Sequence, residues 1–240
     1  MASINYINGL NFAGFLISKL INLDMDFGGP GMEYPGFYML SELRTVVTPA
    51  QFTFSVWDLI LLFQAVFTIV QFLPKFRALP LVQDGVKYWY FASCVAQGFW
   101  SLAFRNREDF FPMLCATVFM GASVGSVVMI ILSQKKVTQP QESAEEYWFL
   151  RFPFELTFGW LITVFLLNAN GLVGEDGAAW AQGIMAALTI LTLLIISIVA
   201  LVVVDLPNYA VASVLAWTLV SCRFEMKYLL LLYTHLLLTF

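Results

Sequence analysis

The amino-acid sequence predicts an all-α integral membrane protein, and three observations support this. Hydrophobic residues make up 60% of the 240 residues and charged residues only 12%, whereas soluble domains average roughly 45–50% and 25%. The mean hydropathy is +0.80. The apolar residues also gather into runs of about 20, the length that a helix needs to cross a bilayer core about 30 Å thick. This composition excludes a soluble globular domain, a disordered chain and a coiled coil.

Seven apolar segments are expected to span the bilayer. The first, residues 4–23, carries Asn5, Asn8, Asn11 and Lys19, so one face of this helix should lie against protein. The later spans are expected at 49–73, 86–104, 110–132, 148–172, 178–204 and 208–222. Lys and Arg divide almost evenly between the two sides of this topology, so they do not indicate its orientation.

The segments between the spans have a different composition. A loop is expected over 24–48, which contains the chain-breaking runs Gly28-Gly29-Pro30-Gly31 and Tyr34-Pro35-Gly36. A hydrophilic linker is expected over 133–146. A single helix over 206–240 would be about 50 Å long at 1.5 Å per residue, too long for one span. The charged run at 223–227 therefore predicts a break and a short eighth helix over 228–240, which either spans the bilayer or lies partly in the interface.

Charge and motif content exclude several classes of function. Lys and Arg number 12 against 16 acidic residues, and no basic run indicates a nucleic-acid partner. Cys94, Cys115 and Cys222 lie in apolar stretches without CxxC spacing, so we expect neither a disulfide framework nor a metal site. The chain has no GxSxG, P-loop, HExxH or dinucleotide motif. We therefore expect a protein that is not an enzyme.

Polar and small residues within the spans leave several interpretations open. Gly121 and Gly125 form a GxxxG motif, which favours close packing of two helices, either within the chain or with a partner chain. Glu155 follows Arg151 by four residues, the spacing of an ion pair on a helix. The glutamines and asparagines, among them Gln64, either hydrogen-bond across helices or contact the polar edge of a ligand. His235, the only histidine, is either an axial ligand to a chlorophyll or haem or a hydrogen-bonded, interfacial residue.

Four tracts, taken together, resemble the tryptophan-rich sensory protein family, also called the translocator protein or TspO/MBR-related family. They are Thr48-Pro49-Ala50-Gln51-Phe52-Thr53-Phe54-Ser55-Val56-Trp57, Gln97-Gly98-Phe99-Trp100, the stretch 153–168 with Gly159-Trp160 and Leu167-Asn168, and Ala216-Trp217. The last tract resembles the C-terminally extended branch of the family. The resemblance implies a TspO-like five-helix membrane bundle over 1–172 and two or three additional membrane helices over 173–240.

The resemblance also implies a binding function. Family members bind tetrapyrroles or sterols in an aromatic groove covered by the first loop, here 24–48. We therefore expect a tetrapyrrole (haem, porphyrin or chlorophyll), a carotenoid or a sterol as ligand. Carried over by position, the ligand-binding residues are Phe54, Trp57, Gln97, Trp100, Trp160 and Asn168. Three positions depart from the family pattern: Leu61 replaces a tyrosine, Asp58 follows the tryptophan of the second helix, and Gln97 replaces an asparagine.

These departures keep a second function open. The chain is alternatively an accessory subunit of a large photosynthetic or respiratory complex, in a thylakoid or mitochondrial membrane. Its partners would then be lipids and neighbouring subunits, or a second copy of the chain. In that case the tryptophans are bundle core and interface anchors. A transporter ranks below both alternatives, because the sequence shows no internal repeat.

Overall fold

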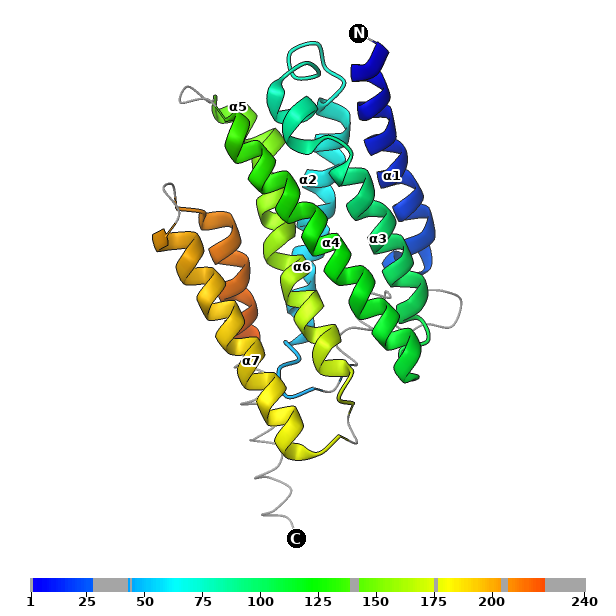
Figure 1. Ribbon diagram of the computed structural model, residues 1–240, viewed down its shortest axis with the longest axis vertical. Helices are drawn as coiled ribbons and strands as arrows, with labels where there is room; N and C mark the ends of the chain where they lie inside the picture. The colour runs from blue at the N-terminus through cyan, green and yellow to red at the C-terminus, as the bar shows by residue number, and fades with distance from the viewer. Residues whose placement is uncertain are drawn as a thin grey trace.

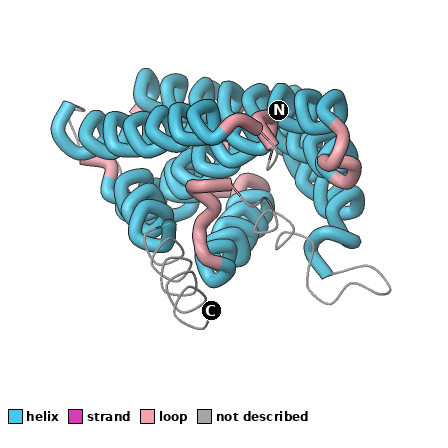
Figure 2. The backbone as a smooth tube through the Cα atoms, turned by 90° about the horizontal axis from the view of Figure 1, so that it is seen from below, coloured by secondary structure: helices cyan, strands magenta, loops and turns pink. Residues whose placement is uncertain are grey.

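The computed structural model describes residues 2–27, 43, 45–138, 143–174, 177–203 and 207–222. Helices joined by short loops make up this part of the chain, and it contains no strand (Figure 2). The elements are α1 (Ala2–Phe27), η2 (Gln51–Ser55), α2 (Val56–Val70), η3 (Leu81–Val86), α3 (Trp89–Phe104), α4 (Phe110–Val137), α5 (Ala144–Glu146), η4 (Tyr147–Arg151), α6 (Phe152–Gly171), α7 (Ala179–Ile198), η5 (Val199–Val203) and a last helix, Tyr209–Cys222.

Among the described residues, four helical segments are long and apolar enough to cross a membrane: Gln51–Val70, Phe110–Val137, Ala144–Gly171 and Ala179–Val203. Tyr209–Cys222 is a shorter apolar helix. Other parts of the chain bury 72% of the most apolar stretch of Ala144–Gly171. The corresponding value for Ala179–Val203 is 22%. The all-α integral membrane fold is therefore confirmed, with the α6 segment central and the α7 segment peripheral.

The helices lie side by side in an up-and-down bundle (Figure 1). α1 lies at one edge, α3 packs between α1 and α4, and α6 contacts both α2 and α4. The pair formed by α7 and Tyr209–Cys222 lies on the opposite side of the molecule from α1. The main apolar core fills the space between α2, α3, α4 and α6. A second apolar cluster joins α6 to the C-terminal pair, and it contains Ile162, Leu193, Ala200, Val211 and Leu215.

Several predicted boundaries differ from the structure, among them the ends of α1 and α4. The first helix continues to Phe27, so the predicted loop over 24–48 begins too early. α4 continues to Val137, into the predicted linker over 133–146. Gln134 explains the longer α4, because its side chain is only 1% exposed and donates to the carbonyl of Leu150 at 2.7 Å. Residues 28–42 and the predicted eighth helix over 228–240 lie outside the described residues.

Asparagine side chains attach α1 to the bundle, as the sequence predicts for its polar face. Asn8 donates to the carbonyl of Gln71 at 2.6 Å and accepts from the side chain of Gln83 at 3.1 Å. Asn11 donates to the carbonyl of Lys87 at 2.9 Å and accepts from the backbone N–H of Phe91 at 3.2 Å. Both asparagines are fully buried. Asn11 therefore provides hydrogen-bond partners for two backbone groups, one just after η3 and one in the first turn of α3.

Replacing Asn11 with leucine is expected to lower the free energy of unfolding by about 1–2 kcal/mol. The substitution leaves the Lys87 carbonyl and the Phe91 N–H without their side-chain partner. The melting temperature of the purified protein in detergent measures the effect. Leu20→Ala is the control, because Leu20 lies on the same helix and is 65% exposed. Equal melting temperatures for the two variants would contradict the proposed role of Asn11.

Candidate functional site

An aromatic cluster, defined here as Phe54, Trp57, Trp100 and Trp160, lies inside the main core. Phe54 and Trp57 are three residues apart on η2 and the first turn of α2, and this spacing places them on one face. Trp100 comes from α3 and Trp160 from α6. The four side chains are at most 6% exposed. The structure thus brings together four of the six ligand-binding residues that the sequence predicts.

The rings of the aromatic cluster contact one another in two geometries. Trp57 stacks on Trp100, with ring centroids 6.0 Å apart and planes 26° apart. Trp160 meets Trp57 edge to face, at 6.0 Å and 85°. Phe54 also meets Trp160 edge to face, at 5.6 Å and 86°. Both are favourable arrangements of aromatic quadrupoles. Trp160 therefore joins the η2 turn to the stacked pair of tryptophans.

Several buried polar atoms beside these rings have no hydrogen-bond partner within the described part of the chain. They include the indole nitrogens Nε1 of Trp100 and Trp160 and the hydroxyl oxygen of Thr53, the residue before Phe54. A buried indole N–H usually finds an acceptor, and an unpaired buried polar group costs about 1–3 kcal/mol. The cluster therefore presents two N–H donors and a hydroxyl that the described residues do not satisfy.

Asn168 is the one asparagine among the predicted ligand-binding residues. It lies on α6 eight residues after Trp160 and is fully buried. Neither its Nδ2 nor its Oδ1 has a partner among the described residues. Asn170, two residues later, differs: its Nδ2 donates to the carbonyl of Leu166 and to Oγ1 of Thr189, both at 2.7 Å. Residues of α6 and α7 thus pair with Asn170, whereas a donor and an acceptor of Asn168 have no described partner.

The comparison with protein families supports the expected relationship. The family model described as TSPO-like protein matches residues 36–239, well over half of the chain. The chain belongs to the TSPO-like protein family. No curated protein and no solved structure matches it. The match includes the aromatic cluster, Asn168 and the C-terminal pair of helices, whereas α1 lies outside it.

Gln97, the sixth predicted ligand-binding residue of this TSPO-like protein, differs from Asn168 because its side chain has a hydrogen-bond partner. Its Nε2 donates to Oγ of Ser93 at 3.1 Å, and Ser93 in turn shares a hydrogen bond of 2.8 Å with Ser123 of α4. Gln97 is 8% exposed. The side chain thus takes part in the α3–α4 contact, and its role toward a ligand stays a prediction.

The two glycines of the GxxxG motif have different surroundings in this TSPO-like protein. A Cβ at Gly121 would lie 3.1 Å from the ring of Phe165, so Gly121 allows close packing of α4 on α6 within the chain. A Cβ at Gly125 would meet no described atom within 4 Å. Packing within the chain therefore explains the glycine at position 121. Contact of Gly125 with a partner chain stays a prediction. His235 lies outside the described residues.

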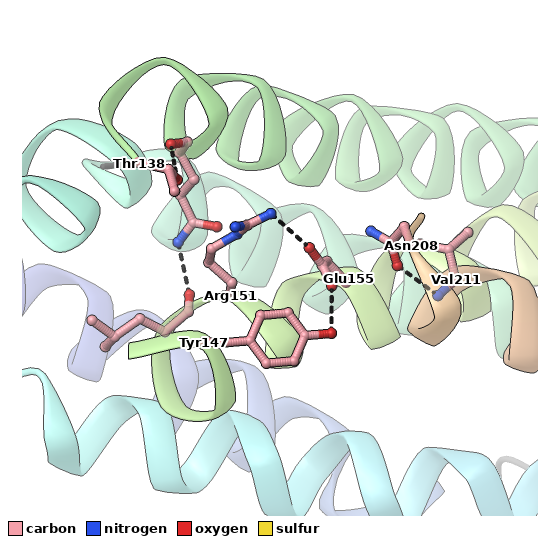
Figure 3. A network of polar contacts seen from close by, with 8 residues as sticks. Thr138, Tyr147, Arg151, Glu155, Asn208 and Val211 are labelled. Atoms are coloured by element: carbon pink, nitrogen blue, oxygen red, sulfur yellow. Dashed lines mark hydrogen bonds and ion pairs between the residues drawn. The ribbon is translucent and has the colours of Figure 1, made fainter. Parts of the chain in front are cut away.

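A polar network lies at the start of α6, the helix that carries Trp160 (Figure 3). Arg151 and Glu155 form the ion pair that their spacing predicts, at 3.2 Å, and the carboxylate also accepts from the Tyr147 hydroxyl at 3.3 Å. The carboxylate side chain is 5% exposed. The sequence analysis did not predict the hydrogen bond of Tyr147 to Glu155, although the pattern Tyr-x₃-Arg-x₃-Glu on one helical face is a usable signal.

A side-chain hydrogen bond connects α2 to α6. Gln64 of α2 donates to Oγ1 of Thr157 at 3.1 Å, and that hydroxyl donates to the carbonyl of Pro153 at 2.6 Å. This confirms the predicted cross-helix role of Gln64. Thr157 precedes Trp160 by three residues on α6. The hydrogen bonds therefore hold the α6 turn that presents Trp160 to Trp57.

Proposed function

We propose that this TSPO-like membrane protein binds a planar, largely apolar ligand at the aromatic cluster. The observation that carries the proposal is a set of buried polar atoms without a described partner: Nε1 of Trp100 and of Trp160 in the aromatic cluster, and both side-chain polar atoms of Asn168, eight residues after Trp160 on α6. A ligand that accepts from the indoles and pairs with the amide would offset their desolvation cost. Tryptophan faces supply the apolar contact.

The number of unpaired polar atoms favours a tetrapyrrole among the candidate ligands. A haem, porphyrin or chlorophyll combines a flat ring with several carbonyl or carboxylate oxygens. A sterol carries one hydroxyl, and a hydrocarbon carotenoid offers no acceptor. A ligand that uses the facing sides of Trp57 and Trp100 must separate these two rings, which are stacked in this structure. We propose that the protein acts by binding and not by catalysis.

A second candidate function is an accessory subunit of a large photosynthetic or respiratory complex, in a thylakoid or mitochondrial membrane. The apolar surface of α7 favours it: Trp180 is 73% exposed, and only 22% of the apolar window of this segment is buried within the chain. Lipids, neighbouring subunits or a second copy would cover this surface. Gln97 and His235 would be candidate contacts to a pigment in such a complex.

Purification from native membranes in mild detergent tests the proposal. We expect a monomer or dimer that binds one equivalent of protoporphyrin IX, recorded by native mass and by the shifted absorption band of the porphyrin. Trp160→Ala should abolish this binding, because Trp160 is 1% exposed and contacts both Phe54 and Trp57. Trp180→Ala is the matched control, since Trp180 is exposed on α7.

The opposite result favours the accessory subunit. Migration of the chain with a large complex, together with porphyrin binding that Trp160→Ala leaves unchanged, would contradict the proposed binding site.

A further inference from the structure

The η2 turn has two aromatic residues with different environments. Phe54 is fully buried and meets Trp160 of the aromatic cluster at 5.6 Å. Phe52 is 48% exposed and meets Trp217 of the last helix edge to face, with centroids 5.4 Å apart and planes at 77°. One short turn therefore joins the candidate binding site to the C-terminal pair of helices. The two aromatic contacts connect residues that are more than 100 positions apart in the chain.

The last helix also holds the chain that leads into this turn. The thiol of Cys222 donates to the carbonyl of Val47 at 3.1 Å. Val47 is 2% exposed and packs with Leu167 of α6 and Ala186 of α7. The helix Tyr209–Cys222 thus contacts residues 47–52 at two points, one before the η2 turn and one within it.

The same helix packs directly on α6, which carries Trp160. A Cβ at Gly159 would lie 3.0 Å from Cβ of Val214 and 3.3 Å from the carbonyl oxygen of Val211. One turn further along α6, the hydroxyls of Thr163 and Thr218 lie 3.4 Å apart. Tyr209–Cys222 therefore contacts both elements whose aromatic residues meet in the cluster, η2 with Phe54 and α6 with Trp160.

We propose that Trp217 is a positioning residue for the binding site: by holding Phe52, it fixes the η2 turn and thereby the contact of Phe54 with Trp160. The inference about ligand affinity rests on the proposed function, whereas the positioning of the η2 turn does not. Loss of one edge-to-face aromatic pair corresponds to a change of about 3- to 10-fold in an equilibrium constant. Among the described ring contacts, Trp217 meets Phe52 and no ring of the aromatic cluster, so it acts through the turn.

Hydrogen exchange of the η2 turn tests the positioning without any ligand. The amide of Thr53, which donates to the carbonyl of Ala50 at 2.9 Å, is the reporter. In protein reconstituted in lipid nanodiscs, Trp217→Ala should raise its exchange rate about 3- to 10-fold. Trp217→Phe should restore the slow rate, because a phenyl ring keeps the edge-to-face contact. Tyr209→Ala is the matched control, an exposed aromatic residue at the other end of the same helix.

Phe52→Leu provides a second variant, because it removes the same contact from the side of the turn. It should raise Thr53 exchange as Trp217→Ala does. An unchanged rate in both variants would overturn the proposal, as would an equal rise in Tyr209→Ala.

Titration with protoporphyrin IX then tests the link to the binding site. Trp217→Ala should raise the dissociation constant about 3- to 10-fold, and Trp217→Phe should keep it within about twofold of the original value. Faster Thr53 exchange without a change in affinity would overturn the role of Trp217 in binding. Failure of the unsubstituted protein to bind porphyrin would instead contradict the proposed function. The exchange rates would still test whether Trp217 fixes the η2 turn.

Discussion

Replacing Asn168 with leucine is expected to stabilise the unliganded protein by about 1–3 kcal/mol and to weaken porphyrin binding about tenfold or more. The stabilisation follows because the amide is fully buried and neither of its polar atoms has a described partner. Leucine has the same number of side-chain heavy atoms, branched at the same carbon, and carries no polar group to desolvate. The loss of affinity follows because the ligand loses one donor and one acceptor, which is worth about 1–3 kcal/mol. The melting temperature and the dissociation constant measure the two effects.

Asn170→Leu is the matched control for this prediction. It removes two hydrogen bonds, to the Leu166 carbonyl and to Thr189, so it should lower the melting temperature and leave porphyrin affinity unchanged. A purely structural role for Asn168 predicts that both substitutions destabilise the protein. A lower melting temperature for Asn168→Leu would therefore contradict our interpretation of its unpaired amide.

Gly159→Ala is expected to lower the free energy of unfolding by about 1–3 kcal/mol, the usual cost of inserting a methyl group into a packed interface. The new Cβ would lie 3.0 Å from Cβ of Val214 and 3.3 Å from the Val211 carbonyl, so the backbone of the last helix must shift. Since this helix also holds Phe52, the exchange of the Thr53 amide should rise as well. Thermal unfolding and hydrogen exchange measure the two consequences.

Gly125→Ala is the control for Gly159→Ala, because a Cβ there would meet no described atom within 4 Å. Alanine has a helix propensity about 1 kcal/mol better than glycine, so this variant should be as stable as the original or slightly more stable. Equal destabilisation by the two alanines would show that the close approach of α6 and the last helix has no special importance.

Hydropathy predicts where the helices of this protein lie but overestimates the number of spans: seven are expected, and in the described part of the chain four helical segments are long and apolar enough to cross a membrane. The span expected at 208–222 corresponds to Tyr209–Cys222, and the asparagines of the first span do lie against protein. The end of α4 could not be predicted in the same way. Residues 133–137 look hydrophilic, but burial of Gln134 against the Leu150 carbonyl keeps them in the helix.

The candidate site was only partly predictable from the sequence. The family resemblance identifies the tryptophans, and membership of the TSPO-like protein family is confirmed. The resemblance does not show that Asn168 lacks a described hydrogen-bond partner while Asn170 has one, because one partner of Asn170, Thr189, comes from α7. Nor does it predict the contact of Trp217 with Phe52, because that contact depends on how the last helix packs on α6.

Indole N–H resonances offer the most direct test of the central claim, that the unpaired donors of the aromatic cluster bind a ligand. The chain has seven tryptophans, which can be labelled with ¹⁵N and assigned by substitution in a protein held in detergent micelles. On addition of protoporphyrin IX, the resonances of Trp100 and Trp160 should move most, because their Nε1 atoms gain an acceptor. The resonance of Trp180, exposed on α7, should stay in place. Unmoved Trp100 and Trp160 resonances at saturating porphyrin would contradict the account.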